Sequence, residues 1–137
     1  MREEQEIRKS FKVEVNKTGF LRVSFFEDII DIEENARRAE LVAADFYNIF
    51  DREPDKKFNI LIDISKMNKS HISEKANEIY RNVARREQVI KVAIIGRPGL
   101  QSRVLSFVLP FMKGEGKKVL WFLDEKKAVS WLGISKE

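Results

Sequence analysis

The sequence predicts a single α/β domain around a mostly parallel, mixed sheet of about five strands, with the order β-β-α-β-α-β-α-β-α. Three observations lead to this fold class. The chain has 137 residues, 43% hydrophobic and 35% charged, which is typical of one globular domain. Short apolar stretches of strand length alternate with longer amphipathic stretches of helix length. Connections long enough to hold a helix favour parallel, right-handed crossovers.

A charged segment opens the chain. We expect residues 1–10 to form a frayed arm or a short added helix, followed by one domain over residues 11–137. No apolar stretch follows the segment, as a secretory signal needs, and no apolar run approaches the ~20 residues that cross a bilayer. The absence of cysteine fits a reducing compartment. We therefore expect a cytoplasmic protein that does not span a membrane.

The first two strands are predicted to form an antiparallel hairpin. Apolar and polar residues alternate over residues 11–15 and again over residues 21–25, the pattern of strands with one solvated face. Residues 16–19 between them have the composition of a turn, and Gly19 can adopt a positive φ.

A long helix is predicted after the hairpin. Asp31 can cap its N-terminus, and Glu34 completes the pattern of a capping box. Pro54 indicates where the helix has ended. Its buried stripe, read from spacings of three and four, consists of Ala36, Ala39, Ala43, Phe46 and Phe50.

Strands and helices alternate over the rest of the chain. The predicted strands are residues 58–64, 92–95 and 119–123, which are apolar and β-rich as interior strands are. The predicted helices are one capped by Ser73, one over residues 100–112, and one over residues 125–132 capped by Asp124. Trp121 and Trp131 are expected to anchor the core.

This order of elements, together with WFLDEKKAVSWLG at residues 121–133, resembles the SpoIIAA-like superfamily, which includes STAS domains and the anti-sigma factor antagonists. The resemblance extends over residues 11–133. In the antagonists, an Asp-Ser pair after the central strand carries a phosphorylated serine at a helix start. Ser70 and Ser73 lie near the matching position and are the phosphorylation candidates, but the Asp-Ser motif is missing. The chain therefore resembles a divergent branch.

The missing motif favours a non-enzymatic regulatory or binding module that acts through protein–protein contacts or self-association. Related domains in transporters and the lipid-transfer CRAL-TRIO proteins imply an alternative, a carrier or sensor of an apolar or lipid-like small molecule. A serine hydrolase using Ser70 or Ser73 with His71 is a further alternative. Adjacent side chains rarely aim at one another as a triad needs, and no Gly-x-Ser-x-Gly elbow is present.

Two segments are candidates for binding. Gly96, Arg97 and Gly99 form a tight loop between a strand and a helix, where backbone N–H groups and a cation could hold an anion, unless they serve only as a turn. The helix over residues 100–112 carries more apolar side chains than one sheet face hides, which indicates a buried core helix, a pocket wall or a partner surface. The pocket or interface candidates are Val104, Leu105, Phe107, Val108 and Phe111.

Composition excludes several classes of site. Without cysteine there are no disulfides, thiolate metal sites or cysteine nucleophiles, and the single histidine removes multi-histidine metal sites. No cofactor or metal motif is found, so we expect neither. The net charge of +4 is mild, and glutamates interrupt the basic helix face around Arg81 and Arg85, so a nucleic-acid partner is not expected.

Overall fold

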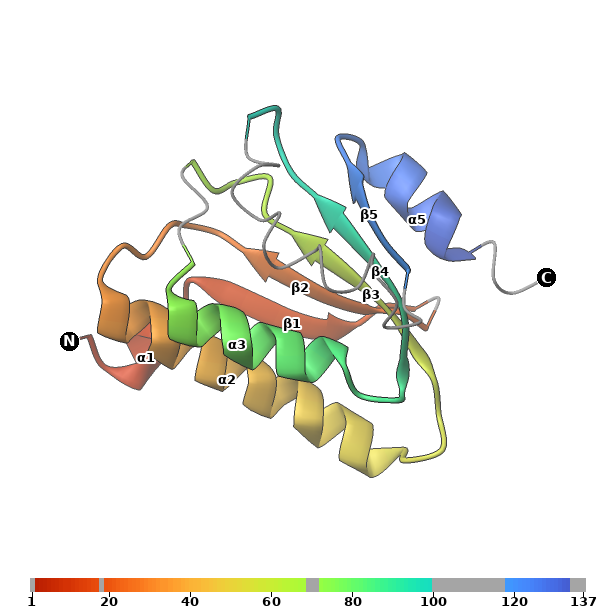
Figure 1. The fold of residues 1–137 in the computed structure, drawn as a ribbon, viewed down its shortest axis with the longest axis horizontal. Coiled ribbons are helices and arrows are strands. Elements are labelled where there is room, and N and C mark those ends of the chain that lie inside the picture. The colour runs from red at the N-terminus through yellow and green to blue at the C-terminus, as the bar shows by residue number, and fades with distance from the viewer. Residues whose placement is uncertain (1, 18, 69–71, 100–117, 134–137) are drawn as a thin grey trace.

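The computed structural model describes residues 2–17, 19–68, 72–99 and 118–133. Within these ranges one sheet has the strand order β1-β2-β3-β4-β5 (Figure 1). The strands are β1 (Phe11–Val15), β2 (Leu21–Phe25), β3 (Phe58–Asp63), β4 (Val89–Ile95) and β5 (Lys118–Phe122). The β1–β2 pair is antiparallel and the other pairs are parallel. The predicted single α/β domain with a mixed, mostly parallel sheet is confirmed.

The helices of the described residues are α1 (Glu4–Arg8), α2 (Ile32–Arg52), α3 (Glu74–Ala84) and α5 (Glu125–Gly133). Asp31 and Ser73 cap their helices as predicted, whereas the Glu34 carboxylate, expected to complete a capping box, accepts hydrogen bonds from Arg2. The Asp31 carboxylate accepts a hydrogen bond from the Glu34 N–H at 2.9 Å, and the Ser73 hydroxyl accepts one from the Ala76 N–H at 3.1 Å. The predicted helix over residues 100–112 lies outside the described residues.

One strand is longer than the sequence pattern predicts. β4 begins at Val89, three positions before the expected start at Val92. The additional residues pair with β3, where Val89 faces Phe58 across a shift in register. The first residues of β4 are strand because they pair with β3, which lies far away in the sequence. The local apolar pattern alone therefore does not predict them.

The helices cover the two faces of the sheet unequally (Figure 1). Successive strand residues point to opposite faces. In β3, Ile60 and Ile62 therefore pack toward α2 and α3, whereas Leu61 packs with Ala128 and Leu132 of α5. The sequence alone left this division of the helices open. The larger hydrophobic cluster lies on the α2 and α3 side.

The charged first segment is docked on the domain. Ile7 of α1 is fully buried, and the Ser10 hydroxyl donates to the Ile7 carbonyl oxygen at 2.6 Å. Arg8 forms an ion pair with Asp45 of α2 at 3.2 Å. Of the two expected forms, residues 4–8 adopt the short added helix. Among the described helices, none combines the length and the apolar character needed to cross a membrane.

Gly96, directly after β4, is placed where no side chain fits. A Cβ atom at this buried position would overlap the Trp121 indole of β5. We predict that Gly96→Ala lowers the free energy of unfolding by about 1–3 kcal/mol, because overpacking forces the indole or the strand to move. Urea denaturation measures this loss.

The control is Gly133→Ala, since no atom lies within 4 Å of a Cβ built at Gly133. It should not destabilise the protein. In a Trp121→Leu background, Gly96→Ala should lower the free energy of unfolding by less than it does in the wild type, because the shorter side chain frees the space. Equal stability of the Gly96→Ala and Gly133→Ala variants would contradict the predicted overlap between a Cβ at position 96 and the Trp121 indole.

Candidate functional site

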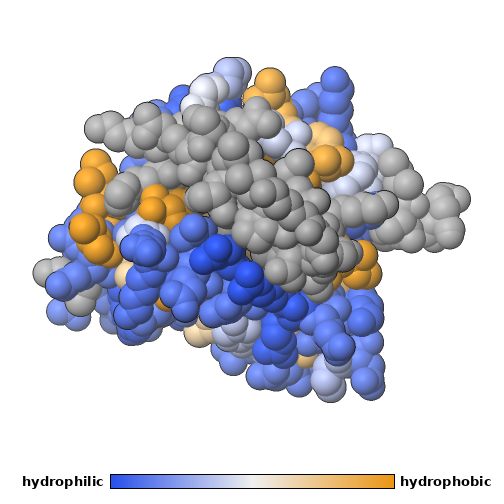
Figure 2. Space-filling view, viewed as in Figure 1, coloured by the Kyte–Doolittle hydropathy of each residue, from blue (hydrophilic) through white to orange (hydrophobic). Residues whose placement is uncertain are grey.

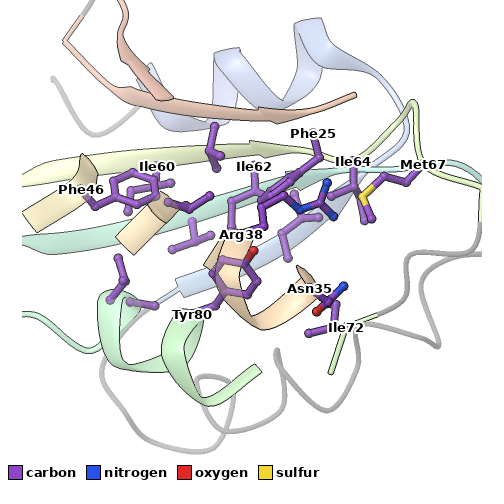
Figure 3. A pocket seen from close by; sticks show the side chains of 16 residues that line it. Phe25, Asn35, Arg38, Phe46, Ile60, Ile62, Ile64, Met67, Ile72 and Tyr80 are labelled. Carbon is purple, nitrogen blue, oxygen red and sulfur yellow. The ribbon is translucent and has the colours of Figure 1, made fainter. Parts of the chain in front are cut away.

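A cavity of about 70 Å³ lies between the sheet and helices α2 and α3 (Figure 3). One water molecule needs about 10–15 Å³ of such space, so this cavity is several times larger. Most of its wall is apolar, including Phe46, Ile60, Ile62, Ile64, Met67 and Val92. A concave, largely apolar space with a few polar groups is the usual form of a small-molecule site.

The cavity wall follows from two sequence periodicities. Alternate residues of β3, Ile60 and Ile62, face α2 because strand side chains alternate. Residues at positions 35, 38, 42 and 46 of α2 recur every three or four positions and so share one helix face. Two of these four are polar, Asn35 and Arg38. Polar atoms are therefore placed within an otherwise apolar wall.

Arg38 is buried in this wall, with only 2% of its surface exposed. Its Nη1 group donates to the Glu27 carbonyl oxygen at 2.8 Å and to the Ser10 hydroxyl at 3.3 Å. The guanidinium lies 4.9 Å from the centre of the Phe25 ring. Burial lowers the pKa of Arg38 from its ordinary value, although Tyr80 and Glu27 favour the charged form. Its Nε is buried without a partner among the described residues.

Tyr80 of α3 approaches the same region. Figure 3 shows its ring rising from α3 into the space between helix and sheet. The ring meets Phe25 edge-on, with the centroids 6.1 Å apart. Burial raises the pKa of the Tyr80 hydroxyl to about 12, and the positive charge of Arg38 opposes this rise. Tyr80 therefore remains a neutral hydroxyl near the cation at ordinary pH.

Asn35 fixes one end of the cavity. Its amide donates to the Ile29 carbonyl oxygen at 2.8 Å, and its amide oxygen accepts from the Ser73 N–H at 2.9 Å. These bonds connect the start of α2 with the turn before it and with the start of α3. Because both partners are backbone groups of buried residues, the connection resists displacement.

No protein-family model matches this chain, and no curated protein matches it either. It is similar to the solved structure of an uncharacterised protein of the DUF3478 family with a SpoIIAA-like fold from Shewanella loihica, with a TM-score of 0.57 and 19% identity over 89% of this chain and 91% of that one. The chain has a SpoIIAA-like fold. The predicted resemblance is thereby confirmed for the architecture.

Of the two serine candidates, only Ser73 is among the described residues, and it lies at the start of α3. Ser73 is buried: its hydroxyl caps α3 and its N–H donates to Asn35. Ser70 and His71 lie outside the described residues. Phosphorylation of either serine, and the serine-hydrolase alternative, remain predictions.

The loop predicted to bind an anion holds the neighbouring loop in place. Arg97 donates through Nη2 to the Met67 carbonyl oxygen at 2.5 Å and to the Asn68 side chain at 2.6 Å. Gly96 lies against Trp121, and Gly99 has a φ of +93°. Anion binding by Gly96, Arg97 and Gly99 remains a prediction.

The other predicted site residues, Val104, Leu105, Phe107, Val108 and Phe111, lie outside the described residues. No group of three or more histidine, aspartate and glutamate side chains in the described ranges is arranged to hold a metal ion. Arg38 and Asn35 were not predicted as site residues from the sequence. Their spacing from Val42 and Phe46 was the available signal, because it places two polar residues on the apolar stripe of the helix.

The raised pKa of Tyr80 predicts a loss of stability in alkali. The unfolded chain releases this proton near pH 10 and the folded protein only near pH 12. The neutral form is thus favoured by folding, and its contribution is present below pH 10 and lost as pH rises toward 12. Because one pKa unit corresponds to about 1.4 kcal/mol, a shift of about two units predicts a loss on the order of 3 kcal/mol.

Urea denaturation as a function of pH measures this loss. Tyr80→Phe should lack it, whereas Tyr47→Phe should keep it, since the other side chains titrate alike in all three proteins. In the Tyr47→Phe variant, phenolate absorption in the near ultraviolet should report Tyr80 alone, since the chain has two tyrosines. If Tyr80→Phe lost as much stability between pH 10 and pH 12 as the wild type, the attribution of this loss to the Tyr80 hydroxyl would be refuted.

Proposed function

We propose that this protein is a non-enzymatic binding module that holds a small, largely apolar molecule between its sheet and helices α2 and α3. The observation that supports the proposal is the cavity itself, which has a mostly apolar wall and is larger than a single water requires. Transfer of apolar surface from water into such a space is favourable. The cysteine-free sequence fits a reducing setting such as the cytoplasm.

The cavity size limits the ligand to a short acyl chain or a single ring. A volume of about 70 Å³ is small for a ligand site, so a short apolar chain suits it best. Each buried methylene contributes about 0.8 kcal/mol, so about five apolar carbons contribute about 4 kcal/mol. That free energy corresponds to a dissociation constant of about 1 mM. Binding experiments must therefore reach millimolar ligand concentrations.

The uncharged probe hexanamide tests the proposal. We expect it to bind the wild-type protein with a dissociation constant of about 1 mM, measured by titration with NMR detection. Ala84→Leu should weaken this binding, because Ala84 lines the cavity and a larger side chain occupies its space. Ala44→Leu is the matched control, since Ala44 lies on the exposed face of α2.

Two outcomes would refute this function. One is a wild-type protein that does not bind hexanamide at millimolar concentration. The other is equal affinity of the Ala84→Leu and Ala44→Leu variants when both are folded by circular dichroism.

A protein-contact role is the second candidate function. It is supported by apolar side chains that remain exposed around the start of α2: Phe26 by 41%, Ile30 by 59% and Ile32 by 68%. Figure 2 shows apolar surface at this end of the molecule among largely hydrophilic surface. If this surface mediates self-association, light scattering should give a dimer mass for the wild type and a monomer mass for Ile32→Lys. A monomer mass for the wild type would refute self-association through this surface.

A further inference from the structure

We infer that the ligand of this cavity is an amphipathic acid whose carboxylate binds Arg38 while its apolar part occupies the space beside Ile60 and Phe46. The inference rests on the proposed function and specifies the chemistry of its ligand. Three observations support it: Arg38 is a buried cation without an ion pair among the described residues, its Nε has no partner there, and an apolar space lies next to it.

The first observation concerns charge. None of the ion pairs among the described residues includes Arg38. The nearby Glu27 side chain is half exposed and pairs with Arg2 at 3.2 Å. The nearby Asp28 carboxylate accepts from the Asn68 N–H at 2.9 Å. A buried charge is costly unless it is paired, so a negative group next to Arg38 would relieve this cost.

The second observation concerns geometry. Nη1 of Arg38 donates to the Glu27 carbonyl oxygen and to the Ser10 hydroxyl. The guanidinium also interacts with the Tyr80 hydroxyl, which stabilises its charged form. Nε is buried and unpartnered among the described residues. In a guanidinium, Nε and Nη2 share one edge, and an edge of this kind binds a carboxylate through two parallel hydrogen bonds. Nη1 thus holds the surrounding structure, whereas Nε is the guanidinium atom that a bound anion would engage.

The third observation concerns the surroundings. Arg38 and Tyr80 both line the cavity, so a bound carboxylate would lie near a cation and a neutral hydroxyl. Figure 3 shows Phe46 and Ile60 toward one end of the cavity, and Ile64 and Met67 toward the other. A short chain directed from Arg38 toward Phe46 would contact only apolar side chains. A neutral ligand would fill the same space but leave the cation unpaired.

Hexanoate and hexanamide provide the test, because they have the same size and differ in charge. We expect hexanoate to bind the wild-type protein at least about tenfold more tightly, as a charge-assisted pair with Arg38 should. Arg38→Gln should reduce the affinity for hexanoate to about that for hexanamide. Arg37→Gln is the matched control: it removes the same charge from a partly exposed position of α2, where Arg37 pairs with Glu4 and Glu40, and should leave the preference for hexanoate unchanged.

The outcomes separate this inference from the function on which it rests. Equal affinity of the wild type for hexanoate and hexanamide refutes the carboxylate inference and leaves the apolar binding function intact. Absence of binding by both probes refutes both. If Arg38→Gln does not fold, Arg38→Met replaces it, because methionine keeps an apolar stem in this buried position and removes the charge. A preference for hexanoate that survives in the folded Arg38 variant also overturns the inference.

Discussion

The architecture depends on the burial of the central strands on both of their faces. Residues of β3 and β4 alternate between the α2 and α3 layer and the α5 layer: Ile62 belongs to the first, and Leu61 and Ala93 to the second. A shift of one residue in either strand would exchange the two sets, so the register is strongly specified. This register determines which side chains of the sheet face the cavity.

Arg38 lies where four parts of the chain meet on one side of this sheet. It hydrogen-bonds to Ser10 after α1 and to the backbone of Glu27 after β2, stacks on Phe25, and lies near Tyr80 of α3. An apolar residue would fill this position without the cost of desolvating a charge. The Glu27 carbonyl and the Phe25 ring each stabilise the positive charge of Arg38 in this buried position. They do not use Nε, which is the atom that a ligand would engage.

The features predicted from sequence are those determined by short spacings. Asp31 and Glu34 lie three residues apart and form the expected cap within a single helix turn. The role of Gly96 could not be predicted in the same way, because it arises from Trp121 on a neighbouring strand. Likewise, Arg38 is one of 26 basic residues, and only the packing of α1, β2 and α3 around it shows that it is buried.

The polar end of the cavity coincides with the carboxyl ends of the parallel strands. Phe25, on which Arg38 stacks, is the last residue of β2, and Ile64 and Met67 follow β3. Ligands of open α/β sheets bind at this edge because loops there are free to vary while the strands stay fixed. Arg97, after β4, holds the Met67 carbonyl and therefore supports the same end. The cavity thus combines a rigid apolar interior, formed by strands and helices, with a polar end formed by side chains and loops at the strand termini.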